Sequence, residues 1–105
     1  MAQWDVYPNP SLRMRETYPY LVDVQSDLLS ALETRLVIPL APTQTQPAQV
    51  PQRLCPLFRV DGKELALLAQ EAGPIDARLL KKRLVSLRSE AHRIVDALDA
   101  VVSGI

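Results

Sequence analysis

YPYLVDVQSDLL, at residues 18–29, and RLVIPL, at residues 35–40, carry the strongest structural signal in this chain. In the first segment, aromatic and branched residues at even positions alternate with Leu21 and Asp23, and a strand places such alternating residues on opposite faces of a sheet. The second segment is a dense run of apolar residues, which is typical of a strand buried on both faces. We therefore predict two strands, the second of them central and largely buried.

The rest of the chain predicts more short strands and one long loop. The additional strands are predicted at residues 4–7, 54–60 and 64–69, followed by an extended piece that reaches about residue 80. Asp61-Gly62 is a two-residue turn signal of the kind that closes a hairpin. Residues 41–53 combine prolines and glutamines without any periodicity, which predicts an unusually long loop.

The C-terminal part predicts an amphipathic helix. Apolar residues recur there at three- and four-residue steps and form one face: Leu84, Leu87, Ala91, Ile94, Val95, Leu98, Val101 and Val102. Charged residues lie away from this face: Arg88, Arg93, Asp96 and Asp99. Gly104 stands where a helix C-cap is usually found. The expected fold is mainly β, with about five antiparallel strands followed by one C-terminal α-helix.

Size and composition narrow the class of protein. At 105 residues, the chain is expected to form one domain over residues 1–105. Its 12 Lys and Arg balance 12 Asp and Glu, so we expect no direct nucleic-acid binding through a general basic field. A single cysteine forms no internal disulfide, and no apolar run is long enough to span a membrane. No signal-peptide layout opens the chain, and we expect a cytoplasmic protein without membrane contact.

Residues that could carry chemistry are few. His92 has Arg88 and Asp96 four residues away on either side, which favours a solvated helix histidine over a catalytic one. One histidine and one distant cysteine do not make a zinc site. Cys55, next to Pro56 in an apolar segment, is interpreted as a small buried residue rather than a reactive thiolate. We therefore expect no catalytic residue, no metal and no cofactor.

A basic segment before the helix admits two interpretations. It contains Arg78, Lys81, Lys82 and Arg83. The segment is either a solvated rim or a docking patch for an acidic segment of a partner protein. No aromatic residue is interleaved with these charges, which argues against single-stranded nucleic acid as the partner.

Two other groups also admit a structural and a functional interpretation. The first comprises Asp23, Gln25, Ser26 and Asp27. Side chains such as Ser26 and Asp27 commonly hydrogen-bond the backbone where a strand turns, which favours a structural role over a polar site. The second group is Ser103-Gly104-Ile105, which is either a frayed end or a compact apolar probe delivered by a rigid helix.

Several of these segments together match a known family pattern. The match is strongest at residues 22–29 and 35–40, and it extends to residues 54–62 and to the helix that ends in Gly104-Ile105. In these features the chain resembles the CcdB family of plasmid and chromosomal toxins. The resemblance implies an SH3-like barrel with a small side sheet and a C-terminal helix, assembled as a homodimer. It also implies a non-enzymatic toxin that binds the DNA gyrase A subunit, traps the cleavage complex and is neutralised by a CcdA-type antitoxin.

The resemblance also implies which residues meet gyrase. By position these are Ser103, Gly104 and Ile105, with Val101 and Val102 on the same surface. Leu28 and Leu29 correspond to family positions near the same dimer face, and Trp4 corresponds to an aromatic residue that supports it. The chain departs from the pattern at Ser103, where the best-known family member carries tryptophan. Losing that ring removes a cation–π contact of about 0.5–2 kcal/mol and apolar burial of about 1.5–3 kcal/mol.

Other functions remain open at this point. Because serine stands at position 103, the interpretation as a non-toxic paralogue stays open. Such a paralogue would bind the antitoxin as a decoy or binding module. The same fold also supports a MazF-like endoribonuclease, because a fold does not specify one function. The acid-rich antitoxin implied by the resemblance would suit the basic segment at residues 78–83.

Overall fold

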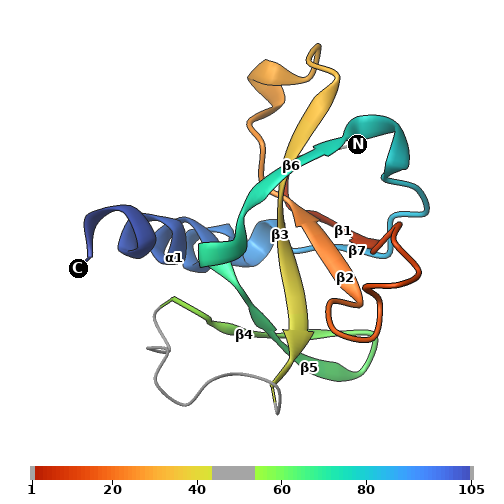
Figure 1. Cartoon of the computed structure of the whole chain (residues 1–105). Coiled ribbons are helices and arrows are strands. Elements are labelled where there is room, and N and C mark those ends of the chain that lie inside the picture. Colours follow the sequence, from red (N-terminus) through yellow and green to blue (C-terminus); the bar gives the residue numbers. More distant parts are fainter. Residues whose placement is uncertain (1, 44–53, 105) are drawn as a thin grey trace.

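The computed structural model describes residues 2–43 and 54–104 (Figure 1). Its strands are β1 (Asp5–Pro8), β2 (Tyr20–Asp23), β3 (Thr34–Pro42), β4 (Leu57–Val60), β5 (Lys63–Leu67), β6 (Gly73–Asp76) and β7 (Val85–Ser86). The helix is α1 (Ala91–Ser103), and short 3₁₀ turns are η1 (Asp27–Leu29), η3 (Ala69–Glu71), η4 (Ala77–Leu79) and η5 (Arg88–Glu90). The fold is mainly β, as expected. Residues 44–53 of the predicted loop lie outside the described residues.

All strand pairs in the described residues are antiparallel and join into one curved, nearly closed barrel. The strand order is β4-β5-β3-β2-β1-β7, and β6 pairs with β3 as well. The long strand β3 lies at the centre of this arrangement, as Figure 1 shows. Its first half pairs with β6, its middle with β2 and its end with β5. The prediction of a central strand at this place is therefore confirmed.

The hydrophobic core follows from the alternation of side chains along β2. Tyr20 and Val22 point into the barrel, where they pack with residues of β3, β4, β5 and α1, including Ile38 and Ile94. On the opposite face, Leu21 packs with residues of β1, β3 and β6 in a second, smaller cluster. Both faces of β2 are thus buried, which explains why its sequence is apolar throughout except for Asp23.

The hairpin between β4 and β5 forms where the turn signal predicted it. Val60 pairs with Lys63, so Asp61 and Gly62 are the two residues of the turn. Their φ angles are +52° and +75°, and a two-residue turn with both φ values positive matches the right-handed twist of the flanking strands. Asp61 and Gly62 tolerate this conformation better than most residues.

The predicted helix begins later than its apolar spacing suggested. Leu84 and Leu87 donate backbone hydrogen bonds of 2.8 Å to Val6 and Trp4, and Val85–Ser86 pairs with β1 as β7. The four-residue helical spacing from Leu87 to Ala91 is therefore a coincidence. The pairing with β1 supplies backbone partners to this segment, so it is extended and not helical.

The buried face of α1 also differs from the prediction. The helix buries Ile94, Ala97 and Ala100, whereas Val95 and Val101 are exposed. Alanine permits the close approach of helix and barrel that larger side chains would prevent. The apolar spacing therefore identified the helix but assigned the wrong residues to much of its contact face.

Arg93 was predicted to lie away from the core, and this is wrong. Its guanidinium lies 4.3 Å from the ring centre of Phe58, donates a 2.6 Å hydrogen bond to the carbonyl oxygen of Leu57, and donates a 2.8 Å bond to Glu90 Oε1. The side chain is half-buried between α1 and β4. Arg93 therefore fastens the start of the helix to the barrel through its aliphatic stem and planar head group.

A buried ion pair joins β2 and β3. Arg35 is 1% exposed and Asp23 is fully buried, and Arg35 Nε donates a 2.8 Å hydrogen bond to Asp23 Oδ2. Asp23 lies opposite Val37 in the sheet, so Arg35 is its diagonal neighbour on the same face. Burial raises the pKa of Asp23, while hydrogen bonds from Arg35 and from the Gln25 N–H oppose that shift. The pair was not anticipated from the sequence.

Arg35→Met tests how far the sheet depends on this pair. It leaves Asp23 buried without a cation, and we expect the free energy of unfolding to fall by about 3–5 kcal/mol. Urea denaturation followed by circular dichroism measures this change. The double variant Asp23→Leu/Arg35→Met removes both charges and should recover much of the loss. If the single variant is as stable as the wild type, the pair does not stabilise the fold.

Candidate functional site

The carboxyl end of α1 presents an exposed apolar surface. Val102 is 87% exposed, and Val101 and Ser103 are exposed beside it. Ser103 Oγ donates a 2.7 Å hydrogen bond to the carbonyl oxygen of Asp99. The helix packs on the barrel by the face that carries Ile94, Ala97 and Ala100, so the apolar side chains at this end face outward.

Gly104 caps the helix as the sequence predicted. Its φ angle is +73°, and its N–H donates a 2.9 Å hydrogen bond to the carbonyl oxygen of Ala100. A residue with a Cβ is strained in this left-handed conformation, which explains glycine at this position. Gly104 thus sets the direction in which the chain leaves α1. Ile105, the third residue of the predicted contact, lies outside the described residues.

A second exposed apolar group is the tip formed by η1. Leu28 is 95% exposed, and Leu29 beside it is also exposed. Ser26 Oγ accepts a hydrogen bond from the Leu28 N–H, and Asp27 Oδ1 accepts one of 3.1 Å from the Gln3 N–H. The predicted structural role of Ser26 and Asp27 at the turning backbone is therefore confirmed.

The tip is also connected to the buried ion pair. Gln25 Nε2 donates a 3.1 Å hydrogen bond to the carbonyl oxygen of Leu29, and its Oε1 accepts one from the Leu36 N–H. Arg35 Nη2 donates to the Gln25 carbonyl oxygen at 3.3 Å and lies 3.7 Å from Asp27 Oδ1. Hydrogen bonds and ion pairs of the polar residues around η1 thus fix the backbone that carries Leu28 and Leu29, whose side chains face outward.

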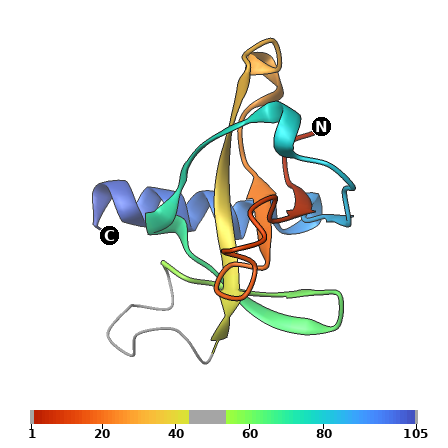
Figure 2. The same cartoon turned by 45° about the vertical axis from the view of Figure 1, so that its right-hand side comes forward.

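The two apolar groups do not meet within one chain. In Figures 1 and 2, η1 lies in the orange loop at the top, whereas the end of α1 projects at the left. Trp4, the third element of the predicted surface, is 8% exposed and packs in the barrel core with Val24 and Leu87. Trp4 therefore packs in the interior below this surface and does not expose its ring.

The predicted basic segment divides into paired and unpaired residues. Arg78 Nη2 lies 2.8 Å from Asp76 Oδ2, and the hydrogen bonds from Arg78 lower the pKa of Asp76 to about 2. Arg83 Nη1 lies 3.4 Å from Asp5 Oδ1. Arg78 and Arg83 are therefore already partnered within the chain.

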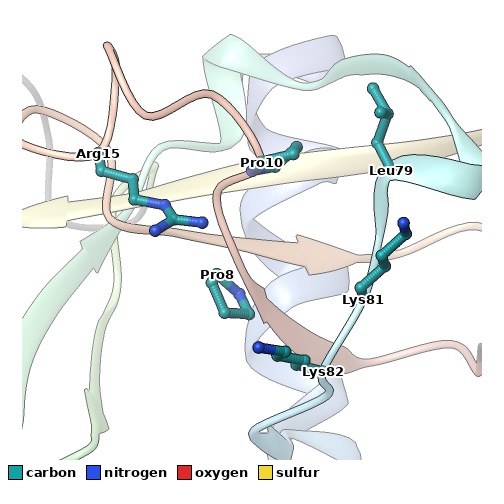
Figure 3. Close-up of a pocket in the computed structure, with 6 residues that line it drawn as sticks. All are labelled: Pro8, Pro10, Arg15, Leu79, Lys81 and Lys82. Carbon is teal, nitrogen blue, oxygen red and sulfur yellow. The ribbon is translucent and has the colours of Figure 1, made fainter.

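The remaining two lysines line a hollow that the sequence did not reveal. Its lining residues are Pro8, Pro10, Arg15, Leu79, Lys81 and Lys82, and its volume is about 300 Å³ (Figure 3). We call it the basic pocket. Arg15 was interpreted from the sequence as part of a solvated turn. Nothing in its linear neighbourhood indicates that the fold brings it close to Lys82.

Arg78→Gln tests the electrostatic coupling in this segment. Removing the guanidinium should raise the pKa of Asp76 from about 2 toward its ordinary value of 3.8, as followed by carboxyl ¹³C chemical shifts. Because the folded-state pKa is depressed, ionised Asp76 stabilises the fold above pH 3.8, and this contribution is lost as the pH falls toward 2. Arg88→Gln is the control and should leave Asp76 unchanged. An Asp76 pKa near 2 in the Arg78 variant would contradict the assignment.

Residues with potential reactivity occupy structural positions. Cys55 is buried, its Sγ lies 3.5 Å from Gln70 Oε1, and burial raises its pKa above the usual value. The interpretation of Cys55 as a buried small residue is confirmed, and His92 is exposed on α1 as predicted. Across residues 2–43 and 54–104, no cluster of three or more His, Cys, Asp or Glu residues could hold a metal ion. No helix within the same ranges is long and apolar enough to cross a membrane.

The comparison with known proteins agrees with this fold. A family model described as CcdB protein matches residues 3–104. The chain belongs to the CcdB family. The match includes β1 through α1, and thus both the η1 tip and the end of the helix. Family membership makes the chain a toxin of a toxin–antitoxin system.

Proposed function

We propose that this CcdB-family chain poisons DNA gyrase. In this proposal a homodimer binds the gyrase A subunit in the cytoplasm and traps the gyrase–DNA cleavage complex until a CcdA-type antitoxin removes it. The observation that carries the proposal is the helix end with Val101 and Val102 exposed next to the Gly104 cap. These residues lie within a family match that covers the whole helix.

The proposed mechanism is protein–protein binding rather than catalysis. Val102 is 87% exposed, and removing apolar surface from water contributes about 25 cal/mol per Å² of area. Anchors of this kind act best when they are held rigid before binding, because less conformational entropy is then lost. The packing of Ile94 and Ala97 against the barrel supplies that rigidity to α1.

A homodimer would bring the separate apolar groups of two copies into one binding surface. Within one chain, η1, which carries Leu28 and Leu29, lies apart from the C-terminal end of α1, as both cartoon views show. In our proposal, two copies associate so that the η1 tip and the helix end contribute to one gyrase-binding face. We also propose that an acidic antitoxin segment contacts the basic residues between Arg78 and Arg83.

Matched charge substitutions test the helix end. Val102→Asp places a charge at the centre of the proposed interface, so we expect linear DNA to disappear from a supercoiled-plasmid cleavage assay with purified gyrase and ATP. Leu12→Asp is the control, because Leu12 is 76% exposed but lies in the turn after β1. Both variants should fold like the wild type, since exposed positions contribute little to stability. Cleavage that persists with Val102→Asp would contradict the proposed interface.

Leu28→Asp tests the η1 tip in the same assay. Leu28 is 95% exposed, so this substitution should not change the unfolding curve. If the tip belongs to the gyrase-binding face, cleavage falls as it does for Val102→Asp. Cleavage equal to that of the wild type would remove Leu28 and Leu29 from the proposed face.

Ser103→Trp tests the one departure from the family pattern. Ser103 is exposed and only its hydroxyl group contacts the helix, so an indole is expected to fit without disturbing the core. We expect gyrase affinity to rise roughly ten- to several-hundred-fold through new apolar burial and cation–π contact. Isothermal titration with the gyrase A breakage–reunion domain measures this gain. Unchanged affinity would place position 103 outside the interface.

A non-toxic, antitoxin-binding paralogue is the second candidate function. It is favoured by the small serine side chain at the exposed position 103. A folded wild-type protein that gives no cleavage, together with cleavage by Ser103→Trp, would support this alternative.

A further inference from the structure

The 3₁₀ turn η1 buries none of its own residues. Leu28 is 95% exposed and Leu29 is 49% exposed, so neither side chain is anchored in the core. A segment with few buried apolar contacts opens easily unless other interactions hold it. The hydrogen bonds around η1 therefore decide where the two leucines lie.

Gln25 joins the end of η1 to strand β3. Its Nε2 donates a 3.1 Å hydrogen bond to the carbonyl oxygen of Leu29, and its Oε1 accepts a 3.0 Å bond from the Leu36 N–H. The main chain of Gln25 is bonded as well, because its N–H donates to Asp23 Oδ1 and its carbonyl oxygen accepts from Arg35 Nη2. Every polar group of this buried residue is thus engaged, which fixes the amide in one orientation.

The amide also replaces a main-chain partner where β2 leaves the sheet. One step beyond the last residue pair of β2 and β3, Val24 lies opposite Leu36, and the Val24 N–H donates to the Leu36 carbonyl oxygen at 2.9 Å. The Leu36 N–H bonds to Gln25 Oε1 instead of to Val24, whose carbonyl oxygen accepts a 3.1 Å bond from Gln3 Nε2. The chain can therefore turn into η1 while its backbone groups keep partners.

Other side chains hold only the beginning of the turn. Ser26 Oγ accepts a 3.2 Å hydrogen bond from the Leu28 N–H, and Asp27 Oδ1 accepts one of 3.1 Å from the Gln3 N–H. At the other end of η1, Gln25 is the side chain that ties the Leu29 carbonyl to the barrel, as far as the described residues go.

The two groups that Gln25 bridges have opposite hydrogen-bonding character. The Leu29 carbonyl oxygen requires a donor, whereas the Leu36 N–H requires an acceptor. A primary amide supplies both without a charge, while an ionised carboxylate only accepts and an aliphatic side chain does neither.

We propose that Gln25 is a positioning residue, which holds Leu28 and Leu29 in the orientation in which the η1 tip meets its partner protein. For the identity of that partner, gyrase, this role rests on the function proposed above. The order of the tip itself is a property of the free protein.

The loop after β1 contains a matched control. Asn9 is 6% exposed, its Nδ2 donates a 2.8 Å hydrogen bond to the carbonyl oxygen of Tyr18, and its Oδ1 accepts one of 2.9 Å from the Ser11 N–H. Its amide thus bridges a backbone acceptor and a backbone donor, as that of Gln25 does, in a loop that makes no printed hydrogen bond to η1. A role in stability alone predicts the same effects at both positions.

Gln25→Glu and Asn9→Asp each remove an amide donor and keep the acceptor. We expect Tm to fall by about 4–8 °C in both variants. Only Gln25→Glu should loosen the tip, so that backbone ¹⁵N order parameters of residues 28–30 fall from about 0.85 to below about 0.6. Isothermal titration with the gyrase A breakage–reunion domain is done at a temperature where both variants are folded. Affinity should fall about three- to tenfold for Gln25→Glu and remain unchanged for Asn9→Asp.

Two further measurements keep the test decisive if Gln25→Glu does not fold. Gln25→Met removes both hydrogen bonds without adding a charge and should loosen the tip in the same way. In the wild type, the side-chain amide protons of Gln25 should exchange with water more slowly than those of the exposed Gln70.

The proposal is overturned by unchanged order parameters in the Gln25 variants, or by a loss of gyrase affinity no larger than that of Asn9→Asp. Exchange at Gln25 as fast as at Gln70 would overturn it in the wild type. A wild-type protein that does not bind gyrase would reject the proposed gyrase function alone, because the order parameters still decide whether Gln25 positions the tip.

Discussion

The ion pair between Arg35 and Asp23 is the constraint on which the rest of this structure depends. Two buried charges are tolerated in the middle of a sheet only when each is the partner of the other. A shift of one residue between β2 and β3 would separate them and would also turn Tyr20 and Val22 away from the barrel core. The pair therefore selects the register, and through Gln25 and Asp27 it also orders the η1 tip.

Strand β3 carries Arg35 and also supports the helix whose end is exposed. Because β2, β5 and β6 all pair with β3, the barrel core and the helix packed on it depend on the same strand. Arg93 then fastens the start of α1 to β4, and the far end projects with Val101 and Val102 exposed. The packed interior thus presents apolar groups outward, as the binding function proposed for this CcdB-family chain requires.

The net charge of zero does not reveal which individual charges are paired in the fold. The 12 basic and 12 acidic residues cancel, yet the fold pairs some of them and leaves others in one place. Arg78 and Arg83 are partnered by Asp76 and Asp5, although they looked equivalent to their lysine neighbours in the sequence. Arg15 joins those lysines only through folding. Which of these positive charges are free for a partner is therefore a property of the tertiary structure.

Local patterns determined much of this protein by themselves. The alternation in β2, the Asp61-Gly62 turn and the Gly104 cap were all predictable, because strand periodicity and left-handed φ values depend on a few neighbouring residues. Only the tertiary structure decided that the helix starts at Ala91, that Ala97 and Ala100 join Ile94 on its buried face, and that Arg35 meets Asp23. Those outcomes depend on backbone partners, close packing and burial supplied by residues distant in the sequence, which no local pattern contains.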